Sequence, residues 1–89
     1  MATILIQYQV KKFDEWKKVY ESMAEFRTSS GAIASLAYQD VSDPNKITVV
    51  NKWNTLANAQ KFAQSPELKN AMEKAGVLGP PNISFLLEV

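Results

Sequence analysis

Residues 46–76 decide the fold of this chain and read KITVVNKWNTLANAQKFAQSPELKNAMEKAG. The first part of this stretch alternates between two faces and is rich in β-branched residues, which predicts a strand that ends at Trp53. Thr55 then occupies the position expected of a helix N-cap. Residues 65–67 (Ser-Pro-Glu) start a second helical segment, with a cap serine, a proline at the first helical position and an acid in the first turn. Gly76 ends that segment, so Trp53 lies at the joint between a strand and an interrupted helix.

A strand and a helix are predicted upstream of this stretch. Thr3–Val10 alternates with period two and contains β-branched residues, which is typical of a strand. Asp14 is the expected N-cap of a following amphipathic helix that ends before Gly31. The apolar stripe of this helix recurs at helical spacing and consists of Trp16, Val19, Tyr20, Met23 and Phe26.

Two more strands complete the pattern. Ala32–Val41 is predicted as a strand, and the turn residues 42–46 (Ser-Asp-Pro-Asn-Lys) join it as a β-hairpin to the strand that ends at Trp53. Residues 77–81 are expected to be extended and rigid, because each proline disfavours helix in the residue before it. Ile83–Val89 then alternates as the last strand.

The predicted element order is β-α-β-β-α-β within a single domain that spans residues 1–89. This is the order of the ferredoxin-like α+β fold, a four-stranded antiparallel sheet with two helices on one face. The other face of the sheet is uncovered in a monomer, although the first and last strands carry apolar residues on both faces. A chain of 89 residues that is 46% hydrophobic is generously apolar for its size. We therefore expect a homodimer that forms through the open sheet face.

Composition excludes several classes of function. The chain contains no histidine and no cysteine, which removes Ser-His-Asp and Cys-His catalysis, disulfides and the usual zinc and haem ligands. Neither a carboxylate cluster nor a glycine-rich loop is visible, so no metal and no cofactor is expected. A net charge of +1 with interspersed signs argues against nucleic-acid binding. The sequence has no secretory signal and no apolar run long enough to cross a membrane, so a cytoplasmic protein is expected.

Four residues on the predicted strands are candidates for a ligand pocket. Trp53 can form a wall that stacks on an aromatic ligand, but an aromatic residue at a strand end is more often part of the core. Asn51 shares its face, and the Asn51 amide can either orient a ligand carbonyl or bond to the neighbouring backbone. Tyr8 and Tyr38 can donate a hydrogen bond to a substrate oxygen, although a strand tyrosine more often packs its ring in the core.

The predicted helices provide further candidates. Trp16 on the first helix and Phe62 on the second can line the roof of a pocket, although an aromatic stripe at helical spacing is usually core. Arg27, near the end of the first helix, can hold a carboxylate. Its charge also suits the negative end of the helix dipole, and this second interpretation is preferred.

Three short motifs resemble those of a known family. They are residues 14–17 (Asp-Glu-Trp-Lys), 51–55 (Asn-Lys-Trp-Asn-Thr) and 62–68 (Phe-Ala-Gln-Ser-Pro-Glu-Leu). With the element order, they make the chain similar to the dimeric α+β barrel superfamily and, within it, to the antibiotic biosynthesis monooxygenase-like group. This resemblance spans almost the whole chain. It implies a homodimer whose two sheets form a barrel, with a pocket between sheet and helices in each subunit.

Characterised members of the group that the chain resembles differ in activity. They include cofactor-free oxygenases that act on phenolic or quinol-like polyketides, haem-degrading enzymes, cyclases and isomerases. The fold alone does not choose among these activities. Haem degradation in the group uses a histidine ligand, and the missing histidine counts against that branch.

Two functional hypotheses follow. The first is a cofactor-independent monooxygenase or cyclase-like enzyme that acts on a small aromatic substrate of the phenolic or polyketide type. The deprotonated substrate would itself react with oxygen, and the protein would supply a dry aromatic pocket with a few polar groups. The alternative is a non-enzymatic small-ligand-binding or accessory homodimer on the same scaffold, which the lack of a general base favours.

Overall fold

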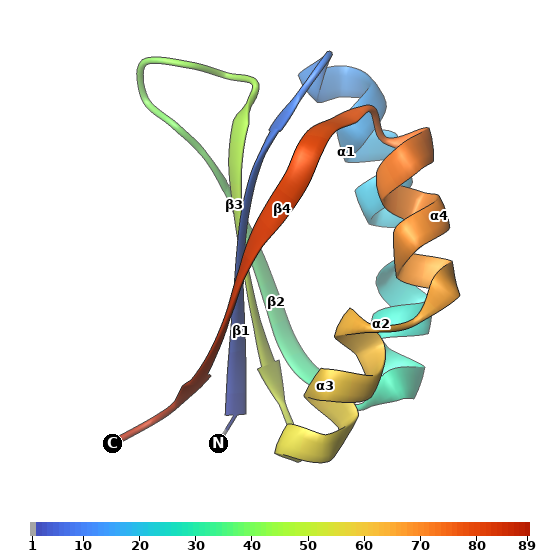
Figure 1. Ribbon diagram of the computed structural model, residues 1–89, viewed down its shortest axis with the longest axis vertical. Coiled ribbons are helices and arrows are strands. Elements are labelled where there is room, and N and C mark those ends of the chain that lie inside the picture. The colour runs from blue at the N-terminus through green and yellow to red at the C-terminus, as the bar shows by residue number, and fades with distance from the viewer. Residues whose placement is uncertain (1) are drawn as a thin grey trace.

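A computed structural model describes residues 2–89 and arranges them as a sheet covered by a layer of helices (Figure 1). Within these residues, four antiparallel strands lie in the spatial order β2-β3-β1-β4. The strands are β1 (Ala2–Val10), β2 (Ala32–Gln39), β3 (Lys46–Trp53) and β4 (Val77–Leu87). The central strands are therefore β1 and β3, while β2 and β4 form the two edges of the sheet.

The helices lie on one face of the sheet (Figure 1). They are α1 (Phe13–Ser22), α2 (Ala24–Ser30), α3 (Leu56–Ala63) and α4 (Pro66–Lys74). The helix predicted after the first strand is thus divided at Met23, whose φ of −92° and ψ of 0° lie outside the helical range. The interruption before Pro66 agrees with the prediction. The ferredoxin-like α+β fold expected from the element order is confirmed.

Two predicted helix caps are present in the structure. The Thr55 hydroxyl accepts the Asn58 backbone N–H at 3.1 Å at the start of α3. The Ser65 hydroxyl accepts the Leu68 backbone N–H at 3.2 Å at the start of α4. Each bond satisfies a backbone donor that the helix leaves without a partner, so local sequence determines both helix starts.

The predicted cap at Asp14 is wrong. Helix α1 begins at Phe13, two residues earlier than a cap at Asp14 implies, with Lys12 in the cap position and no side-chain bond from it. The Asn45 side-chain oxygen, from the β2–β3 hairpin, accepts the Phe13 backbone N–H at 3.1 Å. A distant residue therefore takes the capping role, and Asp14 lies in the first turn, where its charge suits the helix dipole.

Several strand boundaries also differ from the prediction, and two of the differences have a clear physical cause. Strand β2 ends at Gln39 rather than Val41, because the Asp40 carboxylate accepts the backbone N–H groups of Ser42 and Asp43 and starts the turn early. Strand β4 begins at Val77, since the segment expected to be merely extended pairs with the end of β1. The prolines are tolerated there because β4 is an edge strand.

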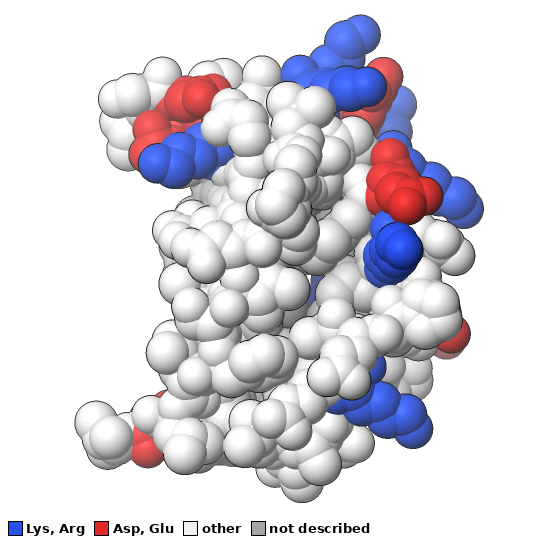
Figure 2. Space-filling model, viewed as in Figure 1, with Lys and Arg blue, Asp and Glu red and all other residues white. Residues whose placement is uncertain are grey.

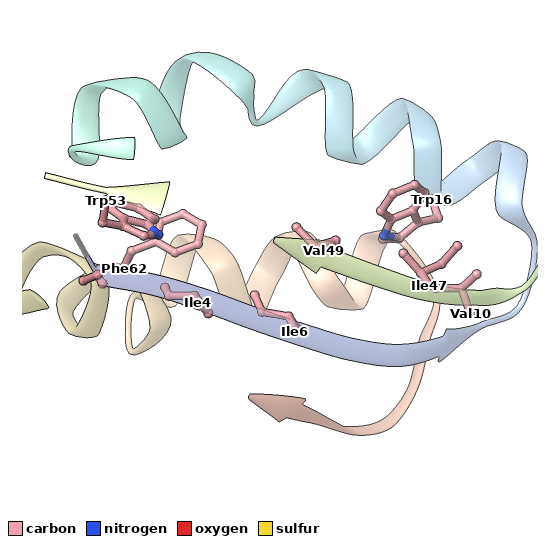
Figure 3. Packing of buried hydrophobic residues seen from close by; sticks show 11 residues of the cluster. Ile4, Ile6, Val10, Trp16, Ile47, Val49, Trp53 and Phe62 are labelled. Carbon is pink, nitrogen blue, oxygen red and sulfur yellow. The ribbon is translucent and has the colours of Figure 1, made fainter. Parts of the chain in front are cut away.

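The core lies between the sheet and the helices. It is built from the helix-facing side chains of the central strands, which alternate along β1 and β3 as period two requires. Trp53 and Phe62 pack together at one end of this core and Trp16 lies at the other end, with Val49 between them (Figure 3). The ring centroids of Trp53 and Phe62 are 4.8 Å apart.

Within the described residues, no helix covers the opposite face of the sheet (Figure 1). The strand register places Leu36 of β2 beside Val50 of β3, and Val50 beside Leu5 of β1, so one apolar row crosses three strands on this face. Leu36 is 52% exposed. Charged side chains gather over the helices and the hairpin, whereas the middle of the visible surface is uncharged (Figure 2). Within residues 2–89, no helix has the length and apolar character needed to cross a membrane.

Two glycines with positive φ allow a matched test of this architecture. Gly31, at the end of α2, has φ +116°, and an added Cβ would lie 2.6 Å from the Asn54 side-chain oxygen, which is held by Asn58. Gly79 has φ +72° and no atom within 4 Å of such a Cβ. We expect Gly79→Ala to lower the free energy of unfolding by about 1–2 kcal/mol through backbone strain alone. Gly31→Ala should cost about 1 kcal/mol more, because the Asn54 contact is also disturbed. Urea denaturation of both variants measures the difference, and equal losses would contradict it.

Candidate functional site

A small cavity of about 50 Å³ lies between the sheet and the helices. Tyr8 of β1 contributes to it from the sheet, and the remaining wall comes from the helices. The other residues that matter for its chemistry are Trp16, Tyr20, Met23, Arg27, Phe62 and Met72. The wall of the cavity therefore contains four aromatic side chains, two of which are phenols, together with one cation.

The Tyr8 hydroxyl is held by the indole of Trp16. The Trp16 Nε1–H donates to the Tyr8 oxygen at 2.7 Å. Desolvation by burial raises the pKa of Tyr8 to about 12, outweighing the opposite effect of the Trp16 hydrogen bond. Tyr8 is therefore protonated at ordinary pH. Since its oxygen already accepts a bond, its own proton is available to an acceptor in the cavity.

Arg27 is a buried cation in the same wall, with only 7% of its surface exposed. Its Nη1 donates to the Tyr20 backbone oxygen at 2.9 Å, and its guanidinium carbon lies 3.9 Å from the centre of the Tyr20 ring. Tyr20 in turn stacks on Trp16, with ring centroids 4.9 Å apart. Burial lowers the pKa of Arg27, and the charged or titratable groups that act against this effect are the phenols of Tyr20 and Tyr8, with no carboxylate among them. Arg27 thus has aromatic neighbours in place of an ionic partner.

Arg27 lies in the last turn of α2, where its charge suits the helix dipole as the preferred interpretation expects. The sequence analysis did not predict that this side chain is also buried in the cavity wall. The spacing of Arg27 along the sequence does indicate that its side chain is buried. Arg27 follows Trp16, Tyr20 and Met23 at intervals of four, three and four residues, so it continues their buried stripe.

Three buried polar atoms have no hydrogen-bond partner within residues 2–89. They are the Nε of Arg27, the Oδ1 of Asn51 and the Nε1 of Trp53. Asn51 is 1% exposed and shares the helix-facing side of β3 with Trp53. Buried polar atoms are nearly always satisfied in native proteins, so such atoms indicate a place for water or a ligand. Two donors and one acceptor are therefore unsatisfied in the interior of the fold.

The structure separates the six residues proposed from the sequence into three groups. Tyr8, Trp16 and Phe62 are brought together around the cavity. Asn51 and Trp53 lie in the adjoining core, each with one unpartnered polar atom.

Tyr38 forms the third group by itself. It is 53% exposed and pairs with Thr48, on the sheet face opposite the helices. It is not among the residues that line the cavity. The alternation of β2 decides this outcome, because neighbouring strand residues point to opposite faces of a sheet.

The model of the antibiotic biosynthesis monooxygenase family matches residues 1–74, which run from β1 through α4. The chain belongs to this family. The match confirms the relationship suggested by the short motifs around Trp16, Trp53 and Phe62. Among curated proteins, none matches the chain.

Solved structures of low sequence identity share the fold. A protein from Bordetella bronchiseptica that carries the same family name has 15% identity and a TM-score of 0.84, over 99% of this chain and 96% of that chain. SnoaB, a cofactor-independent oxygenase from Streptomyces nogalater, has 11% identity and a TM-score of 0.82, over 99% of this chain and 92% of its own. A conserved protein from Methanosarcina mazei has 19% identity and a TM-score of 0.78, over 96% and 89% of the two chains.

The raised pKa of Tyr8 predicts a specific alkaline titration. The tyrosinate absorbance of the wild type minus that of Tyr8→Phe should show a midpoint near pH 12. Between the ordinary value of 10.0 and about 12, the unfolded state loses the Tyr8 proton while the folded state keeps it, so stability falls as pH rises through this range. The decline in melting temperature across this window should be smaller in Tyr8→Phe. A difference titration centred near pH 10 would contradict the burial of this hydroxyl.

Proposed function

We propose that this protein is a cofactor-independent monooxygenase that acts on a small phenolic aromatic substrate, whose anionic form is stabilised by Arg27. The observation that carries this proposal is the buried guanidinium with aromatic neighbours, no carboxylate among the groups that shift its pKa, and an unpartnered Nε. A buried cation is costly unless a negative charge compensates it, and a bound phenolate or enolate would supply that charge. Family membership and the shared fold with SnoaB support the same class of reaction.

The chemistry requires an activated substrate, because the protein has no histidine to act as a base. A guanidinium beside the bound phenol favours its anion, so the proton can pass to water at moderate pH. The anion transfers one electron to O₂, and the resulting radical and superoxide combine to a peroxide at carbon. Loss of water then leaves a carbonyl, so that a CH₂ group and O₂ give C=O and H₂O. The Tyr8 hydroxyl, which stays protonated, can donate a hydrogen bond to the developing oxygen anion.

Asn51 and Trp53 are assigned supporting roles in this proposal. The Asn51 oxygen can accept and the Trp53 indole can donate a hydrogen bond, so each can bind a water molecule or a polar substituent. Both side chains are almost completely buried, which keeps their polar atoms in place. Trp16 and Phe62 provide apolar walls that exclude bulk water and strengthen the electrostatic effect of Arg27.

The size of the cavity limits what can bind without movement. A dry cavity of roughly 150 Å³ can enclose a benzene ring. The cavity of about 50 Å³ is smaller, so an aromatic substrate cannot be enclosed while the walls keep their present positions. Met23 and Met72 are the adaptable part of the wall, because unbranched methionine side chains repack easily.

The second hypothesis, a non-enzymatic ligand-binding protein, has two observations in its favour. These are the small cavity and the lack of histidine as a general base. A protein of this kind would bind the phenolic ligand through the same Arg27 contact and release it unchanged. The two hypotheses therefore predict the same ligand affinity, but only the oxygenase hypothesis predicts oxygen uptake.

Replacement of Arg27 tests both hypotheses. With a dihydroxyanthrone as substrate, Arg27→Met should lower kcat/KM for oxygen uptake by about 10²–10³-fold, as expected for loss of a charge that stabilises an anion. Arg27→Lys should keep part of the activity. The free energy of unfolding of Arg27→Met should be unchanged or higher, because a buried cation is removed.

The matched control is Lys18→Met, which removes an exposed cation from α1 and should leave oxygen uptake unchanged. Full activity of Arg27→Met would contradict the assigned role of this residue. Wild-type protein that binds the anthrone without consuming oxygen would exclude the oxygenase and leave the ligand-binding hypothesis.

We also propose that the chain assembles as a homodimer through the open face of the sheet. The apolar row of Leu36, Val50 and Leu5 supports this proposal, because it crosses three strands without cover. The rows beside it are mixed in character and include Lys52 on one side and Gln7 on the other. An apolar centre with a polar surround is typical of an interface between proteins. Two such sheets packed face to face would bury the row in both copies.

Leu36→Lys tests the dimer without disturbing the core. Leu36 is half-exposed on an edge strand, so a lysine can be accommodated in the monomer at little cost. Sedimentation at micromolar concentration should give a dimer for the wild type and a monomer for Leu36→Lys, because the charge would be buried at the interface. Leu56→Lys, on the exposed side of α3, is the control and should remain dimeric. A monomeric wild type would disprove the proposal.

A further inference from the structure

A groove of about 390 Å³ lies between helix α4 and edge strand β4, and we call it the β4 groove. Most of its wall is apolar, and its half-buried apolar residues are Ala63, Leu68, Met72, Pro81 and Ile83. Gln64, Ser65 and Lys69 are its polar residues. Ile83 pairs with Ile6, which is buried in the core, so the β4 groove lies on the helix side of the sheet.

The β4 groove and the interior cavity share two side chains. Leu68 and Met72 line both of them. These residues are four positions apart on α4, so they lie on the same face of this helix, one turn from each other. Both side chains are aliphatic and are held by packing alone, and a methionine side chain repacks easily. A small shift of this pair would therefore connect the cavity to the surface.

Other depressions that adjoin the cavity are closed by more specific contacts. Tyr20 and Arg27 line both the cavity and a depression beside β2, and the Arg27 Nη1 donates to the Tyr20 backbone oxygen at 2.9 Å. Trp16 lines both the cavity and a second depression, and its Nε1–H donates to Tyr8. Phe62 adjoins a third depression, whose polar wall includes Ser29, Ser30, Asn54, Asn58 and Lys61. The β4 groove thus differs from these three in having an aliphatic partition and a mainly apolar wall.

Molecular oxygen suits this partition in both size and polarity. The cavity of about 50 Å³ exceeds the roughly 10–15 Å³ that one water-sized molecule needs, so a diatomic molecule fits in it. O₂ is uncharged and apolar, and it therefore gives up little hydration when it passes between aliphatic side chains. An ion would lose its hydration at the same place without compensation. The partition therefore favours O₂ over charged solutes.

We propose that O₂ reaches the interior cavity through the β4 groove, past Leu68 and Met72. This inference rests on the proposed function, because that reaction consumes O₂ in the cavity. The aliphatic pair admits the gas and keeps bulk water out. A dry cavity in turn strengthens the effect of the Arg27 charge on a bound anion. Leu68 and Met72 thus control access of the second substrate.

Paramagnetic relaxation by dissolved O₂ tests this route without any reaction. The reporters are the methyl groups of two buried residues. Ala75 is 4% exposed and lines the cavity, whereas Ile4 is 0% exposed and is not among the lining residues. In the wild type, dissolved O₂ should enhance the relaxation of the Ala75 methyl protons more than that of the Ile4 methyl protons. Leu68→Phe should remove most of the enhancement at Ala75, because the larger side chain fills the partition.

Oxygen kinetics provide a second measurement. With dihydroxyanthrone as the other substrate, Leu68→Phe should raise the KM for O₂ by about threefold or more, while kcat at saturating O₂ changes much less. The matched control is Lys61→Phe, which adds the same ring at an exposed position in the polar depression beside Phe62. This control should change neither the KM for O₂ nor the relaxation of Ala75.

The outcomes separate this inference from the proposed function. Unchanged Ala75 relaxation in Leu68→Phe, with circular dichroism showing folded protein, would overturn the β4 route. Loss of the enhancement in Lys61→Phe would also overturn it, because O₂ would then pass Phe62. If Leu68→Phe does not fold, Met72→Ala takes its place: a wider partition should increase the enhancement at Ala75, and no increase would refute the route. Enhancement that depends on Leu68, in protein that takes up no oxygen with dihydroxyanthrone, would retain the route and exclude the oxygenase.

Discussion

The stack of Trp16, Tyr20 and Arg27 is the contact that allows a cation to lie buried in this fold. A guanidinium buried to 7% exposure would be costly in a purely aliphatic core. Here the Tyr20 ring lies 3.9 Å from its carbon, and the Tyr20 backbone oxygen accepts one of its N–H groups. These contacts stabilise the cation without neutralising it. The stack therefore keeps a positive charge in the wall of the interior cavity.

Three surfaces of one small domain follow from the way in which the helices cover the sheet. Over the central strands the helices pack closely, and the core contains Trp53, Phe62 and a small cavity (Figure 3). At β2 they stop short, because alanine and serine replace large residues, and two open depressions remain beside Tyr20 and Glu21. On the opposite face, residues 2–89 place no helix, and the apolar row through Val50 is uncovered (Figure 1). The cavity, the depressions and the uncovered sheet face are thus consequences of a single two-layer arrangement.

Sequence reasoning succeeded where structure depends on neighbours in the chain. Thr55 and Ser65 cap their helices as predicted, because the bonded N–H lies three residues ahead of each. It failed at Asp14, because Asn45 reaches the same helix start from a hairpin that is distant in sequence. The prediction for Arg27 was incomplete, because it gave the position of the charge at a helix end but not the burial of the side chain. Its spacing from Tyr20 identified the stripe, but the aromatic partner that makes burial tolerable comes from the packing.

The sequence by itself determined the element order, the ferredoxin-like fold, the absence of histidine and cysteine chemistry, and the family motifs. These properties depend on residue type and short-range periodicity, both of which can be read along the chain. Only the tertiary structure decided that Tyr8, Trp16 and Arg27 meet, that Asn51 and Trp53 keep unpartnered polar atoms, and that Tyr38 leaves the interior cavity. Those outcomes depend on strand register and on how far each helix extends over the sheet, which are set by packing between segments that are distant in sequence.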